Sequence, residues 1–211
     1  ILYVYGGGRC SDVSGNTNVE LKGEGVHVYS VVGGGLVDED EGAANVGKNT
    51  NITISGGAWA GDTEVSSSQP DKIAVAGGGH ILSNDPSMIG TNSDIKTATT
   101  NVGGEVHITL NGITGNLVDC IVGGCYDAGK SNAEKITGTT GPVKIDIDNC
   151  RFESQFHRIF GGGYVAWGGN NRDIQVKGNV EITVDHSTVQ YLYGGGCGIT
   201  AALPLVTGDV N

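Results

Sequence analysis

The chain has 211 residues, including 38 glycines and only 4 prolines, and its formal net charge at pH 7 is −11. The glycines have no three-residue period, which excludes a collagen-like chain, and aliphatic residues recur often enough to build a packed core. The acidic balance argues against nucleic-acid binding, which needs clustered Lys and Arg. We find no signal-peptide pattern and no apolar run of about 18 residues, so we expect no membrane insertion.

Glycine triplets recur along the whole chain. They begin at Gly6, Gly33, Gly77, Gly161 and Gly194, with Gly123-Gly124-Cys125 as a variant. The steps between their first residues are 27, 44, 46, 38 and 33, which indicates one repeated unit with insertions of unequal length.

An aliphatic residue lies two positions before every triplet. The six residues of this column are Val4, Val31, Val75, Ile121, Ile159 and Leu192. Strands that stack in register place equivalent side chains above one another. The column therefore predicts a strand that leads into each triplet and faces the core.

A second predicted strand alternates apolar and polar residues. Its apolar positions are Val19 and Leu21; Ile52 and Ile54; Val106, Ile108 and Leu110; Val143, Ile145 and Ile147; and Val180, Ile182 and Val184. Alternation with a period of two predicts one face toward the core and one toward solvent.

Each repeat is thus expected to contain a strand, a short corner, a second strand, a triplet and a loop of variable length. Parallel stacking of such units predicts an all-β, right-handed parallel β-helix of about five to six coils, with the variable loops on one edge. We expect one domain over residues 1–211. Because the sequence begins and ends within strand patterns, we expect a fragment of a longer repeat protein, whose exposed edges permit end-to-end self-association.

The triplets are interpreted as corners of the coil. Glycine accepts positive φ and lets neighbouring coils approach closely. A phosphate-binding loop is excluded, because no helix pattern follows any triplet.

The loops after the triplets are the predicted ligand-binding segments, at about residues 36–48, 80–102, 126–141 and 164–177. Flat aromatic side chains in or near them suit stacking on sugar rings or on a protein partner. The candidates are Trp59, Tyr126, Tyr164 and Trp167. Packing of these rings onto the β-structure is the alternative.

Metal-binding patterns are weak in this sequence. The acidic run Asp38, Glu39, Asp40 and Glu41 offers carboxylates for Ca²⁺, although it lacks the spacing of a calcium loop, and a solvated acidic loop is the alternative. The five histidines are scattered and expected at the surface, and the five cysteines form no CxxC motif and are expected to be mostly buried. We therefore expect no cofactor, with Ca²⁺ as the one weak candidate.

A catalytic alternative rests on charged residues near one strand end. Asp146, Asp148, Arg151, Arg158 and Asp185 are the candidate residues. They could supply the base and the cations that a polysaccharide lyase needs around a uronate. They could equally be ordinary outward positions of strands.

An apolar strand ending in a glycine triplet, then a loop and an Asn/Gly-Val-x-Ile strand, resembles the β-solenoid repeats of very large bacterial cell-surface proteins and adhesins. The resemblance covers essentially all 211 residues. It implies an extracellular, surface-attached bacterial protein, and it carries over no catalytic residue. The expected function is binding of host or matrix glycans or proteins through the loops after the triplets. The alternatives are a lyase-like enzyme and a purely structural stalk.

Overall fold

The computed structural model describes residues 3–38, 41–61, 73–82, 97–115, 120–128, 135–152, 158–166, 171–198 and 203–211. All regular secondary structure in these ranges is β-strand, and the strands pair in parallel. The predicted all-β class with parallel sheets is therefore confirmed. These ranges contain no helix with the length and apolar character needed to cross a membrane.

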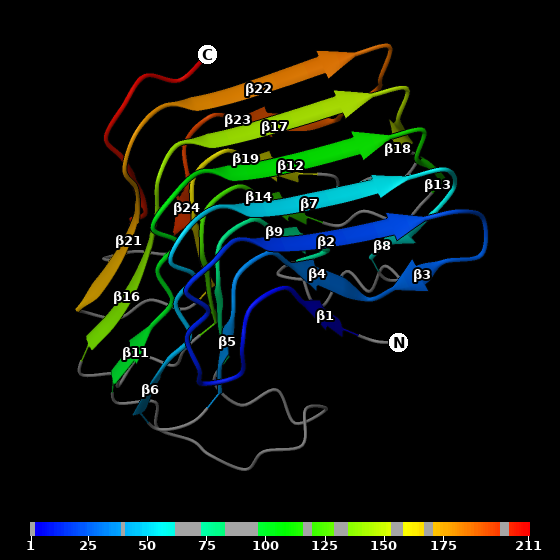
Figure 1. Cartoon of the computed structure of the whole chain (residues 1–211). Coiled ribbons are helices and arrows are strands. Elements are labelled where there is room, and N and C mark those ends of the chain that lie inside the picture. The colour runs from blue at the N-terminus through cyan, green and yellow to red at the C-terminus, as the bar shows by residue number, and fades with distance from the viewer. Residues whose placement is uncertain are drawn as a thin grey trace.

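The structure contains four large sheets, and each sheet receives one strand from each successive repeat (Figure 1). The triplet sheet contains the strands that lead into the triplets: β1 (Tyr3–Tyr5), β4 (Ser30–Val32), β9 (Val75–Ala76), β14 (Cys120–Val122), β19 (Arg158–Phe160) and β23 (Tyr191–Tyr193). The long-strand sheet contains β2 (Thr17–Lys22), β7 (Thr50–Ser55), β12 (Val106–Asn111), β17 (Val143–Asp148) and β22 (Val180–Asp185).

The other two large sheets follow the triplets along the chain. The post-triplet sheet contains β5 (Leu36–Val37), β10 (His80–Leu82), β15 (Tyr126–Ala128), β20 (Tyr164–Val165) and β24 (Cys197–Gly198). The return sheet contains β6 (Glu41–Ala43), β11 (Thr97–Thr99), β16 (Lys135–Thr140), β21 (Arg172–Val176) and β25 (Leu205–Val206). Two short pairs complete the strands: β3 (His27–Val28) with β8 (Trp59–Ala60), and β13 (Thr114–Gly115) with β18 (Arg151–Phe152).

These strands require a correction to the sequence interpretation, which placed loops directly after the triplets. Two further strands follow each of the triplets that begin at Gly33, Gly77, Gly123, Gly161 and Gly194. Of the predicted loops, residues 83–96, 129–134 and 167–170, which separate the strands of the post-triplet sheet from those of the return sheet, lie outside the described residues.

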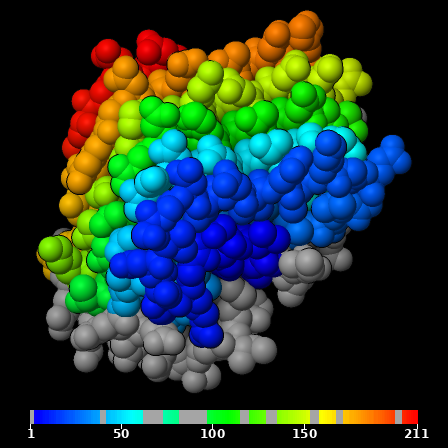
Figure 2. Space-filling model, in the orientation of Figure 1, coloured from blue at the N-terminus to red at the C-terminus, as the bar shows by residue number. Residues whose placement is uncertain are grey.

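The register within the long-strand sheet agrees with the predicted alternation. Ile108 pairs with Ile52 on one side and with Ile145 on the other, and all three are buried. The polar residues between such positions point outward, so this sheet presents a polar face. Successive repeats form successive layers, which appear as consecutive colour bands in the space-filling view (Figure 2).

The core has three parts. The largest cluster lies between the long-strand and triplet sheets and includes Ile52, Ile108 and Ile121. A second lies between the post-triplet and return sheets and includes Ile81 and Ile136. The third, here called the corner cluster, joins the other faces of the triplet and post-triplet sheets; it consists of Val32, Ile73, Ala76, Cys120, Val122, Tyr126, Ala128, Phe160, Tyr164 and Ala166. Both faces of the inner triplet strands β4, β9 and β14 are therefore buried, whereas the end strand β23 is exposed.

The triplets form the bend between the triplet sheet and the post-triplet sheet, and steric contact between layers explains their composition. A Cβ on Gly33 would lie 2.5 Å from the carbonyl oxygen of Gly77, and a Cβ on Gly34 would lie 2.8 Å from the carbonyl carbon of Gly78. No triplet glycine has positive φ. The predicted close approach of adjacent repeats is thus confirmed, and this approach, rather than positive φ, explains the glycines.

Candidate functional site

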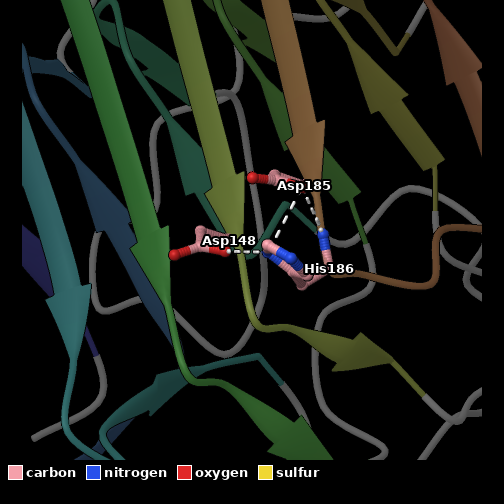
Figure 3. A group of neighbouring side chains, drawn as sticks. All are labelled: Asp148, Asp185 and His186. Atoms are coloured by element: carbon pink, nitrogen blue, oxygen red, sulfur yellow. Dashed lines mark hydrogen bonds and ion pairs between the residues drawn. The ribbon is translucent and has the colours of Figure 1, made fainter.

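Three metal-ligating side chains meet where two long strands end. Asp148 is the last residue of β17, Asp185 is the last residue of β22, and the two are paired in register. His186 follows Asp185 directly. Its imidazole turns back between the two carboxylates (Figure 3). Among the described residues, this is the one group of three His, Cys, Asp or Glu side chains whose ligand atoms all lie within 4.8 Å of one another.

The imidazole contacts both carboxylates through the same nitrogen. His186 Nδ1 lies 3.4 Å from Oδ1 of Asp148 and 3.2 Å from Oδ1 of Asp185. All three side chains are open to solvent, with relative exposures of 48% for Asp148, 64% for Asp185 and 72% for His186. The group is therefore accessible to a hydrated ion from outside.

The position of His186 is set by a backbone bend that all repeats share. The residue after each long strand is left-handed: φ is +101° at Gly23, +64° at Gly56, +70° at Gly112, +55° at Asn149 and +43° at His186. This conformation is easy for glycine, tolerated by asparagine and uncommon for other residues. The last of these repeats therefore places an imidazole where the first three have no side chain.

Hydrogen bonds hold this bend in place. The backbone N–H of His186 donates to Oδ1 of Asp185 at 3.0 Å. The Ser187 hydroxyl donates to the backbone oxygen of Asp185 at 2.6 Å and accepts from the N–H of Cys150 at 2.8 Å. The segments that follow β17 and β22 are thereby linked to each other next to the candidate site.

Two carboxylates in register on neighbouring strands repel each other, because like charges directly opposite are destabilising. A cation between Asp148 and Asp185 relieves this repulsion. His186 in its protonated form is one such cation, and a divalent metal ion bound by all three side chains is another.

The five predicted catalytic residues are divided among three sheets. Asp146, Asp148 and Asp185 lie on the polar face of the long-strand sheet. Arg151 begins β18 in a short two-stranded sheet, and Arg158 begins β19 in the triplet sheet. Neither arginine forms an ion pair with one of these aspartates; Asp146 instead lies 3.6 Å from Lys144 Nζ.

Two of the predicted ligand-binding aromatics are buried. Tyr126 is 8% exposed and Tyr164 is 4% exposed, and their rings pack edge to face with centroids 5.7 Å apart. The bend at the triplets brings their strands against the triplet sheet, where they join the corner cluster. Their placement corresponds to the packing role that the sequence left open.

The row of packed rings formed by Tyr164 and Tyr126 continues through His80. Its imidazole stacks between Tyr126 and Tyr5, at centroid distances of 4.7 Å and 6.1 Å, and it is hydrogen bonded to the Tyr5 hydroxyl at 3.2 Å. Burial lowers the pKa of His80 to about 3 and raises that of Tyr5 above its usual value. The expectation that the histidines lie at the surface is therefore wrong for His80.

The remaining aromatic candidates lie apart from this cluster. Trp59 is half-buried in β8, and His27 covers one face of its indole with the ring centroids 3.2 Å apart. Trp167 lies outside the described residues.

The predicted calcium-binding run is described only in part. Asp38 accepts from Nε of Arg9 through both carboxylate oxygens, at 2.9 Å and 3.0 Å. Glu39 and Asp40 lie outside the described residues, as does the side chain of Glu41. The five cysteines are present as thiols, and Cys120, Cys125 and Cys150 are buried, as expected for most of them.

The spacing of the histidines along the chain does not predict the grouping of His186 with two aspartates. Asp148 and Asp185 meet through strand register, which chain spacing does not display. The available signal was that both aspartates occupy the last position of the same repeated strand and that one precedes a histidine.

No protein-family model, no curated protein and no solved structure matches this chain. The candidate site is therefore defined by its geometry alone.

Proposed function

We propose that the chain is part of a right-handed parallel β-helix of an extracellular, adhesin-like bacterial protein, and that it binds or displays rather than catalyses. The observation that carries this proposal is the repeated order of four sheets, each of which receives one parallel strand from successive repeats. Such stacking gives a rigid scaffold that tolerates insertions between strands. The resemblance of the triplet repeats to bacterial surface β-solenoids supports the assignment.

The proposed contact segments are residues 83–96, 129–134 and 167–170, the last of which includes Trp167. The strands before these segments are neighbours in the post-triplet sheet, and the strands after them are neighbours in the return sheet. The strand ends that flank these segments therefore lie side by side on the scaffold. The proposed ligand is a host or matrix glycan or protein.

A combined glycan and matrix-protein array tests this proposal. We expect binding by the 211-residue chain, and loss of binding when residues 83–96 and 167–170 are replaced by Gly-Ser segments of equal length. A matched control replaces residues 62–66, which lie outside the three proposed segments, in the same way and should still bind. Absence of binding on the whole array would favour a stalk, and release of unsaturated products from uronate polymers would favour an enzyme.

A further inference from the structure

We propose that Asp148, Asp185 and His186 form a binding site for one divalent transition-metal ion, with Zn²⁺ as the representative ion. The site goes beyond the proposed ligand-binding function and does not depend on it. It lies on the polar face of the long-strand sheet, at the ends of β17 and β22.

The distances between the ligand atoms fit a shared ion. Zn²⁺ binds His nitrogen at about 2.0–2.1 Å and Asp oxygen at about 2.0–2.2 Å, so a nitrogen and an oxygen ligand of a tetrahedral site lie about 3.3–3.5 Å apart. His186 Nδ1 lies 3.4 Å from Oδ1 of Asp148 and 3.2 Å from Oδ1 of Asp185. A direct charge-assisted hydrogen bond would be shorter, at about 2.7–2.9 Å. Both contacts thus match two ligands of one metal ion better than a direct ion pair.

The scaffold fixes the approach of all three side chains. The register of β17 and β22 places Asp148 beside Asp185, and the bend after β22 directs His186 toward both. The equivalent pair in the preceding repeats is Ser55 and Asn111, each followed by a glycine. The ligand set is consequently confined to one pair of neighbouring repeats, and no similar site arises elsewhere on this strand column.

The chemistry of the donors selects the class of ion. One imidazole nitrogen and two carboxylate oxygens suit Zn²⁺ and its transition-metal neighbours, whereas Ca²⁺ prefers six to eight oxygen ligands. Three protein ligands leave a fourth position for water, and the exposure of the three side chains gives solvent access to it. The bound ion would neutralise the two stacked carboxylates and link the ends of two adjacent strands.

Isothermal titration of the 211-residue protein with Zn²⁺ tests the site. We expect one ion per chain, with Ca²⁺ binding much more weakly. The substitutions His186→Gln and Asp148→Asn should each lower Zn²⁺ affinity about tenfold or more, because each removes one of three ligands. Zn²⁺ should also raise the melting temperature of the unmodified protein and not that of His186→Gln.

Matched controls separate this site from other sources of zinc binding. His107→Gln removes a histidine on the same sheet that contacts a single carboxylate, Glu105, at 3.0 Å, and Asp146→Asn removes a neighbouring aspartate on the same face. Both controls should bind Zn²⁺ as the unmodified protein does. The five thiols are present in every variant, so binding by cysteine would survive in all of them. Equal Zn²⁺ affinity in His186→Gln and the unmodified protein, or no binding at millimolar Zn²⁺, would overturn the proposal and leave a direct Asp–His ion pair.

Discussion

Gly34 and Gly78 occupy equivalent places in adjacent layers, and their backbones are so close that a Cβ on Gly34 would lie 2.8 Å from the carbonyl carbon of Gly78. The same relationship recurs between Gly78 and Gly124, where the corresponding distance is 2.9 Å. The layers therefore meet backbone to backbone at this bend. Any side chain at the middle triplet position must push two layers apart.

Gly34→Ala should accordingly destabilise the protein by about 1–3 kcal/mol or more, the cost of overpacking a site that cannot expand. Gly15→Ala is the matched control, because nothing lies within 4 Å of its Cβ position and its φ is not positive. Urea denaturation of the two variants measures the difference. Equal midpoints would contradict the steric explanation of the triplets.

The buried imidazole of His80 should make stability depend on pH. Its pKa of about 3 in the folded protein lies below the value of about 6.5 expected in the unfolded chain, so between these values the unfolded state binds more protons. Its contribution is fully present above pH 6.5 and is lost as the pH falls, by up to about 1.4 kcal/mol per pH unit.

Urea denaturation between pH 7.5 and pH 4.5 tests this dependence. His80→Phe keeps a ring in the stack but cannot be protonated, so its loss of stability toward low pH should be smaller. His107→Gln, which alters a more exposed histidine, should behave as the unmodified protein does. Parallel pH profiles for His80→Phe and the unmodified protein would remove His80 as the cause.

A second prediction about charge concerns Asp127 and Arg172. Nε of Arg172 lies 2.8 Å from Oδ2 of Asp127, and the two side chains are 1% and 0% exposed. Removing one partner of a buried ion pair leaves a buried charge uncompensated, so Asp127→Asn should cost about 3–5 kcal/mol.

Asp38→Asn is the control, because it breaks the ion pair between Asp38 and the exposed Arg9. Such a surface ion pair contributes less than about 1 kcal/mol. Replacing both buried residues, as in Asp127→Leu with Arg172→Met, should recover much of the loss. If the double variant were less stable than Asp127→Asn, the uncompensated charge could not be the main cause.

The thiols should differ in their reactivity. Burial raises the pKa of Cys125 to about 11, and Cys120 and Cys150 are also buried, while Cys10 and Cys197 are half-buried. The thiolate is the reactive form, so an uncharged aqueous thiol reagent should modify Cys10 and Cys197 first and the other three only on unfolding. Mass spectrometry of the labelled peptides identifies the order, and early labelling of Cys125 would contradict it.

The parallel stacking could be predicted from the sequence because one aliphatic position precedes every triplet. The column from Val31 through Ile159 is buried, and the alternation in β12 gives its buried and outward positions directly. These features depend on local pattern, which one sequence displays.

The post-triplet strands could not be predicted in the same way. Leu36–Val37 and Tyr164–Val165 are two-residue strands buried on both faces, so they carry no alternation. Burial of Tyr126 depends on the bend that sets the post-triplet sheet against the triplet sheet. The contact of His186 with Asp148, 38 residues earlier in the chain, depends on the register between β17 and β22. Both are tertiary relationships that chain spacing does not encode.

The direction of the backbone hydrogen bonds has a mechanical consequence. In all four sheets these bonds join one repeat to the next, so they run along the stack. A force that pulls the two ends of the stack apart would load the bonds of one interface at a time, and repeats would peel away in succession at modest tension. A force along the strands would instead shear many bonds together. A tether that pulls along the strands would therefore resist force far better than one that pulls the two ends of the stack apart.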